Sequence, residues 1–127
     1  MIQNYFKIGN VWIGSPQAIM SRLTAIDGAT VLTVGNVSSI TRTIGTKAAG
    51  VWSYANPVAL TVSTVISALS TSNGWSNDSV GYNFRDIVPG SMLTNPGETR
   101  IEYIVNTTDG LNATWVVEAN TKNPFTN

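Results

Sequence analysis

The feature that most constrains the fold is a two-residue alternation of side chains across residues 99–119, interrupted by a turn that ends in Asp109-Gly110. Such alternation is typical of strands with one buried face, and Asp-Gly is typical of a tight turn between strands. The pattern predicts a β-hairpin. Its buried face comprises Ile101, Tyr103, Val105, Leu111, Ala113, Trp115, Val117 and Ala119. Its solvent face carries the charged residues Arg100, Glu102 and Glu118.

Shorter segments of the same kind fill most of the chain from residue 27 onward. Val, Ile, Thr and aromatic residues are frequent in them, and Gly, Asn, Pro and Asp separate them. The predicted strands are 29–34, 37–44 with Ile40 and Ile44 inward, 51–54, 59–62 and 81–88. Between 62 and 69 the apolar residues fall at helical spacing. We therefore predict an all-β fold, a two-sheet antiparallel β-sandwich with one short helix.

The first 26 residues fit this pattern least well. Residues 2–13 are rich in apolar and aromatic side chains around Gly9-Asn10, which allows either a hairpin or an extended arm on a neighbouring subunit. Residues 16–25 have apolar side chains near helical spacing, and Ser15-Pro16 could start a helix. We therefore divide the chain into an N-terminal arm or attachment segment, 1–26, and a sandwich, 27–127.

The aromatic residues of this arm predict a surface for binding a partner, because buried aromatic residues contribute much of the binding energy of protein interfaces. The predicted partner-interface residues are Tyr5, Phe6, Trp12, Ile13 and, near the other end of the chain, Phe125. On this interpretation, removal of residues 1–14 abolishes binding and leaves the fold intact.

Charge and hydropathy indicate which partners to expect. Seven basic and seven acidic residues give a formal net charge of zero. The net charge therefore gives no electrostatic reason to expect nucleic acid or an anionic membrane as partner. No apolar stretch approaches the ~20 residues of a transmembrane helix, and the start of the sequence lacks the pattern of a secretory signal. So few charges suit a protein whose surface is covered by neighbours. We expect synthesis in the cytoplasm and assembly there.

The residue types also restrict catalysis. The sequence has no His and no Cys, which removes the usual triads, thiol nucleophiles and the commonest zinc ligands. The acidic residues are interpreted as solvated surface charges rather than as a glycosidase pair: Asp78, Asp86, Glu98, Glu102 and Asp109. We predict no enzyme activity, no catalytic residue, no cofactor and no metal.

Two weaker patterns have alternative interpretations. The polar residues Asn73, Asn77 and Asp78 could bind calcium, but they are more typical of a turn in which the side chains bond the backbone. The aromatic residues could form a stacking platform for a sugar, although in a small domain they more often belong to the core. They are Trp12, Trp52, Trp75, Tyr82 and Trp115.

The order of motifs from residue 27 to 118 resembles that of small bacteriophage particle proteins with an Ig-like sandwich. These are related in pattern to the N-terminal module of siphovirus baseplate upper proteins. The most specific motif is Trp75…Asp78…Gly81-Tyr82-Asn83-Phe84. The others are Val37-Ser38-Ser39-Ile40-Thr41, Leu60-Thr61-Val62, Val65-Ile66-Ser67-Ala68-Leu69 and Ile101-Glu102-Tyr103. The resemblance implies an Ig-like fold and a structural or attachment role.

The expected function is therefore that of a virion structural protein. The first hypothesis is a capsid decoration or cement protein that binds the major capsid protein, stabilises the shell and forms a homo-oligomer. The alternatives are a tail, neck or baseplate component that contacts other virion proteins, a carbohydrate-binding attachment module, and an enzyme.

Overall fold

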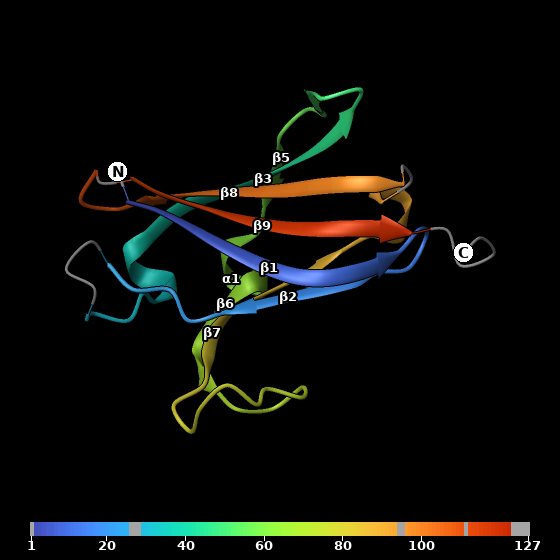
Figure 1. Ribbon diagram of the computed structural model, residues 1–127. Coiled ribbons are helices and arrows are strands. Elements are labelled where there is room, and N and C mark those ends of the chain that lie inside the picture. Colours follow the sequence, from blue (N-terminus) through green and yellow to red (C-terminus); the bar gives the residue numbers. More distant parts are fainter. Residues whose placement is uncertain (1, 26–28, 94–95, 111, 123–127) are drawn as a thin grey trace.

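A computed structural model describes residues 2–25, 29–93, 96–110 and 112–122, and for residues 2–10 it describes the backbone alone. Two β-sheets pack face to face (Figure 1). The larger sheet has the order β1 (Ile2–Trp12), β9 (Asn112–Lys122), β8 (Gly97–Thr107), β3 (Val37–Ala48) and β4 (Val51–Tyr54), with β5 (Val58–Leu60) also paired to β3. The smaller sheet has the order β2 (Gln17–Ser21), β7 (Tyr82–Val88) and β6 (Ile66–Ser70). The predicted all-β sandwich is confirmed.

The helical content is small. α1 (Val62–Val65) is a single turn, and two 3-10 turns lie at Val34–Asn36 and Gly90–Met92. No helix in the described part of the chain is long and apolar enough to span a membrane.

The predicted hairpin forms β8 and β9, in the register that the alternation requires. Tyr103 lies opposite Trp115, and both side chains are buried. Arg100 lies opposite Glu118 on the other face, with 3.7 Å between its Nη2 and the carboxylate Oε1. The strand pairing therefore follows the predicted pattern, although Val116, at an alternate position, is also buried, and Leu111 lies outside the described residues.

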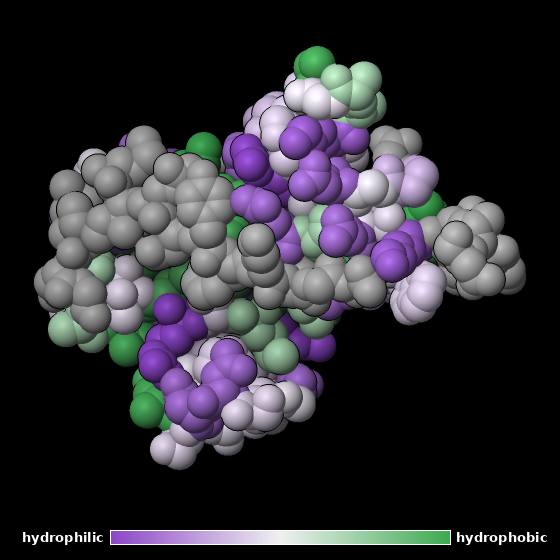
Figure 2. All heavy atoms as spheres, viewed as in Figure 1, coloured by the Kyte–Doolittle hydropathy of each residue, from purple (hydrophilic) through white to green (hydrophobic). Residues whose placement is uncertain are grey.

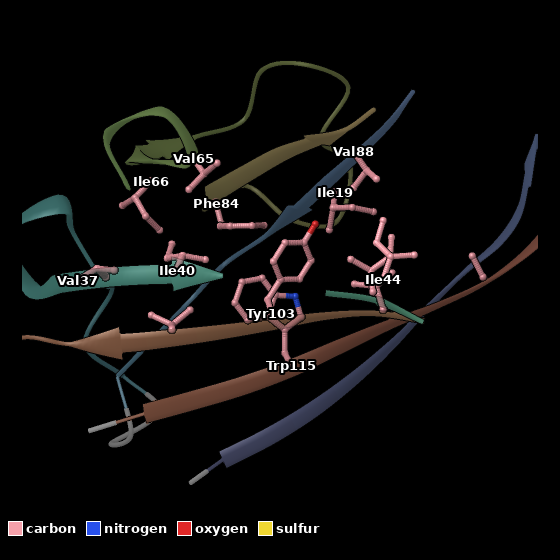
Figure 3. Packing of buried hydrophobic residues seen from close by; sticks show 14 of the residues in the cluster. Ile19, Val37, Ile40, Ile44, Val65, Ile66, Phe84, Val88, Tyr103 and Trp115 are labelled. Carbon is pink, nitrogen blue, oxygen red and sulfur yellow. The ribbon is translucent and has the colours of Figure 1, made fainter. Parts of the chain in front are cut away.

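An aromatic group occupies the centre of the core between the two sheets (Figure 3). The rings of Tyr103 and Trp115 stack with their centroids 4.6 Å apart. Phe84, from the smaller sheet, meets Trp115 edge-on at 4.7 Å. Such pairs contribute about 0.5–1.5 kcal/mol each beyond the area that they bury, so this group joins the sheets at their midpoint.

The N-terminal segment is the main departure from expectation. β1 is a single extended strand that runs parallel to β9, with a register irregularity between Lys7 and Asn10 in place of a hairpin turn. The helix suggested for residues 16–25 is wrong, because Gln17–Ser21 is strand β2, antiparallel to β7. Ile19 and Ser21 are both buried, so the real period is two, and Pro16 directly precedes the strand, where its missing N–H is tolerated.

The first 26 residues thus supply an edge strand to each sheet. Removal of residues 1–14 would take away β1 and expose the edge of β9, so we no longer expect the fold to survive this deletion intact. The proposed boundary lies within residues 26–28, outside the described residues, and the division into two segments stays a prediction.

The helix predicted from the spacing of apolar residues between 62 and 69 is only partly present. It covers Val62–Val65, and Ile66–Ser70 forms strand β6 instead. β-branched side chains disfavour the helix, and pairing with β7 gives the backbone of this segment another set of hydrogen bonds.

Candidate functional site

The hairpin of β3 and β4 projects from the body of the sandwich (at the top of Figure 1). Its two-residue turn has positive φ at both positions, 52° at Ala49 and 78° at Gly50, which matches the twist of the flanking strands. Val51, next in the chain, is 64% exposed. Figure 2 shows hydrophobic residues at the outermost point of this projection. The turn therefore presents apolar surface to solvent.

Aromatic and cationic side chains cover one side of this hairpin. The Arg100 guanidinium lies 4.3 Å from the ring centroid of Trp52, and its Nη1 donates to the Tyr54 hydroxyl at 3.3 Å. A Cβ atom at Gly45 would lie 2.5 Å from the Tyr54 ring, so the ring occupies the place that a side chain would take. Tyr54 is nevertheless 45% exposed. These contacts hold the two aromatic rings in place.

β4 is also an edge strand. Among the described strands it pairs with β3 alone, which leaves the backbone groups of its outer side available to another strand. Open edges are used for binding by β-augmentation and are otherwise prone to aggregation. We define the docking hairpin as the turn at 48–51 together with β4.

The residues that the sequence predicted for the partner interface lie elsewhere. Trp12 is 50% exposed at the end of β1, and the neighbouring Ile13 is half-buried, with its N–H donating to the Lys122 carbonyl at 2.9 Å. Tyr5 and Phe6 belong to β1, but their side chains and Phe125 lie outside the described residues. β1 and β4 form opposite edges of the larger sheet, so Trp12 and the docking hairpin are separate surfaces.

Sequence reasoning missed the docking hairpin as a site. The signal was present in Ala49-Gly50, which separates two short segments and is followed by Trp52 and Tyr54 at alternating positions. An exposed edge cannot be recognised without the order of the strands, which the sequence leaves open.

One of the acidic residues expected at the surface is buried. Asp86, 4% exposed, accepts hydrogen bonds from Arg42 Nη1 at 2.9 and 2.8 Å and from the Tyr103 hydroxyl at 2.7 Å. We call Arg42, Asp86 and Tyr103 the buried cluster. Burial, followed by the adjacent Asp86 carboxylate, raises the pKa of the Tyr103 phenol far above its ordinary value. The cluster joins the facing sheets: Arg42 and Tyr103 both donate to Asp86, and Arg42 Nη2 also contacts the Met92 sulfur at 3.5 Å.

A second Arg–Asp–aromatic group joins the loop between β6 and β7 to Arg22, which directly follows β2. Asp78 accepts from the Gly81 N–H at 2.9 Å, the Val80 N–H at 3.0 Å and Trp75 Nε1 at 3.2 Å, and it pairs with Arg22 at 2.7 Å. The hydrogen bond from Gly81, followed by Arg22, holds the pKa of this carboxyl far below its usual range. We call Arg22, Trp75 and Asp78 the surface cluster.

These contacts account for the most specific motif of the sequence. Asp78 bonds the backbone ahead of it, as expected of a turn. Asn83 is fully buried and bonds the Leu23 N–H and both the Leu23 and Leu32 carbonyls, at 2.6, 3.0 and 2.7 Å. The motif therefore ties the loop to β7 and secures the segment that follows β2.

The described residues contain no group of three acidic side chains that could hold a metal ion. Their carboxylates are also engaged at separate places, since Glu98 pairs with Lys47 at 3.2 Å and Glu118 with Arg100. The five aromatic residues considered for a sugar platform do not form one surface. Trp75 and Tyr82 are in contact, with ring centroids 5.7 Å apart, whereas Trp12 and Trp52 lie at opposite edges of the larger sheet.

Comparison with models of known protein families gives no match. Comparison with curated protein sequences gives no match either.

Proposed function

We propose that the chain is a structural protein that acts by binding neighbouring protein subunits, as a capsid decoration or cement protein of a bacteriophage particle. The observation that carries the binding role is the docking hairpin, which projects from the sandwich with Val51 64% and Tyr54 45% exposed. The particle itself is inferred from the resemblance of residues 27–118 to phage particle proteins.

The ordered side chains of the docking hairpin suit a protein that binds and stabilises an assembled shell. Its aromatic side chains are already held by Arg100 and by the close approach of Tyr54 to Gly45, so little side-chain entropy is lost on binding. A protein that binds only the assembled shell stabilises it by mass action. The proposed homo-oligomer would form if the open edge of β4 paired with a second copy of the chain.

A tail, neck or baseplate component is the second candidate, because the same surfaces would serve it with different neighbours. The copy number of the chain separates the two locations. Quantitative mass spectrometry of purified particles, with the major capsid protein as internal reference, is expected to give a comparable copy number or a simple large fraction of it. Far fewer copies would place the protein on the tail or at a vertex, and its absence from particles would overturn the virion proposal.

The docking hairpin itself is tested by Val51→Asp, which places a carboxylate at its tip. We expect binding to particles that lack the protein to weaken by about 30-fold or more, as for loss of an interface hot spot of about 2 kcal/mol. Val34→Asp is the matched control, because Val34 is also exposed (47%) and lies in the 3-10 turn before β3. Equal binding by the two variants, both folded by circular dichroism, would remove the hairpin from the interface.

A further inference from the structure

A cavity of about 340 Å³ opens at the side of the sandwich where β2 is the edge of the smaller sheet. Its walls come from β2, from the loop at 74–77 and from the inward face of β9. Trp75 lines it from the loop and Trp115 from the core. Ligand pockets run from about 300 to 1,000 Å³, so this cavity suits one small ring rather than an extended chain.

The lining restricts the chemistry of a ligand. None of the described residues around the cavity is charged. Ser21, Ser76 and Asn77 contribute hydroxyl and amide groups, and the two indole rings contribute flat apolar surface. Charged ligands are disfavoured in such a site because they would lose hydration without gaining an opposite charge. The lining therefore favours a neutral molecule that has both an apolar face and several hydroxyl groups.

The Trp115 side chain supplies a second, independent observation. The residue is 3% exposed, and its Nε1–H has no hydrogen-bond partner within the part of the chain that the structure describes. A buried donor without an acceptor costs about 1–3 kcal/mol. The same indole lines the cavity, but its Nε1 atom is itself buried, so an oxygen atom of a ligand becomes its acceptor only when the indole turns toward the cavity on binding.

Hydrogen bonds hold the loop that lines the cavity in place without a ligand. Trp75 Nε1 donates to Asp78, which is held by two backbone N–H groups and by Arg22. Asn73 Nδ2 donates to the Tyr82 hydroxyl at 2.6 Å, which anchors the start of the loop to β7. A wall held by this many bonds loses little entropy when a ligand arrives.

We propose that this cavity binds a single neutral sugar ring, such as the terminal pyranose of a glycan. One C–H face of the ring lies against an indole, and a ring or hydroxyl oxygen accepts from Trp115 Nε1. The remaining hydroxyls bond Ser76 and Asn77 at the rim. This site is separate from the docking hairpin and does not depend on the proposed structural role.

The test is a titration of the full chain with glucose, galactose, rhamnose and N-acetylglucosamine, followed through the indole N–H signals in NMR spectra. Trp→Phe variants assign each signal. We expect saturable shifts at Trp75 and Trp115 with at least one of these sugars, and no shift at Trp52. A single ring is expected to bind with a Kd on the order of 1 mM, so titration to about 100 mM is sufficient.

Three comparisons make the test specific. Asn77→Ala, at an exposed position, is expected to weaken binding about 2- to 10-fold, and Trp52→Phe to leave it unchanged. Trp115→Phe, which keeps an aromatic ring and removes the donor, is expected to weaken it by a similar factor. Glucuronic acid is expected to bind more weakly than glucose. The absence of any saturable shift, an unchanged affinity in Asn77→Ala, or tighter binding of the acid would overturn the proposal.

Discussion

The protein contains two groups that each consist of an arginine, an aspartate and an aromatic residue, and the two groups lie in opposite environments. The buried cluster joins an arginine, an aspartate and a tyrosine between the sheets, and the side chains of Arg42 and Asp86 are each 5% exposed. The surface cluster joins Arg22, directly after β2, to Trp75 and Asp78 on a loop, and the side chains of Arg22 and Asp78 are 33% and 34% exposed. The comparison teaches that burial, rather than the number of contacts, decides how much such a group contributes to the stability of the fold.

In the buried cluster, the loss of any partner strongly lowers the free energy of unfolding, because the group that remains is not solvated by water. Breaking one half of a buried ion pair leaves a charge that neither water nor protein compensates. In the surface cluster, water can replace each lost partner and salt screens the charges, so the same contacts contribute mainly to the shape of the loop.

The largest effect is expected for Asp86→Asn, which keeps the shape of the side chain and leaves the Arg42 guanidinium without a counter-charge. We expect the free energy of unfolding to fall by about 3–5 kcal/mol, measured by urea denaturation. The matched change at the surface, Asp78→Asn, is expected to cost much less. Equal losses in the two variants would contradict the comparison.

The triple variant Arg42→Met, Asp86→Leu, Tyr103→Phe removes the buried polar groups together. Because replacement of a buried pair by apolar residues is often neutral or stabilising, we expect most of the loss caused by Asp86→Asn to be recovered. Arg42 Nε, which has no partner among the described residues, strengthens this expectation. A triple variant as unstable as Asp86→Asn would show that the cluster itself determines the packing of the sheets.

Tyr103→Phe is expected to have an intermediate effect. It removes the hydroxyl that donates to Asp86 at 2.7 Å and keeps the ring that stacks on Trp115 at 4.6 Å. Hydrogen bonds to charged groups contribute about 1.5–3 kcal/mol, so the free energy of unfolding should fall by that amount. A loss below about 0.5 kcal/mol would mean that Arg42 alone satisfies the carboxylate.

The smallest effect on stability is expected for the charge on Asp78. It is measured through the dependence of stability on pH. The pKa of this carboxyl is lowered in the folded protein, so its contribution is complete above the ordinary value of about 3.9 and is lost as the pH falls through the lower folded value. The parent should therefore lose more stability than Asp78→Asn between about pH 5 and pH 2. Parallel pH profiles for the two proteins would show that the surface cluster is not coupled to folding.

Local patterns in the sequence were sufficient for the β8–β9 hairpin, because the core-facing positions of both strands recur at every second residue and the turn lies between them. They were misleading for the buried cluster, because charged residues were assigned to the surface. The correct signal was positional: Arg42 lies between Ile40 and Ile44, and Asp86 between Phe84 and Val88, all of which are buried. Opposite charges at inward positions of two predicted strands indicate a pair that joins the sheets.

Other features depend on how the strands are ordered and paired, which local patterns leave open. The parallel pairing of β1 with β9 joins distant segments, and nothing within either segment specifies the register. The docking hairpin and the cavity depend on which strands lie at the edges. Hydrophobic spacing also failed where a short apolar run allowed both periods, as in β2 and β6.

The pairing of β1 with β9 also has a consequence for the order of events during biosynthesis. Ile2 lies opposite Ala113, so β1 leaves the ribosome long before β9 and has no sheet partner until β9 has been made. Contacts of such long range slow folding, and an unpaired strand is open to wrong partners in the meantime. The nascent chain should therefore depend on chaperones more than its size alone would suggest.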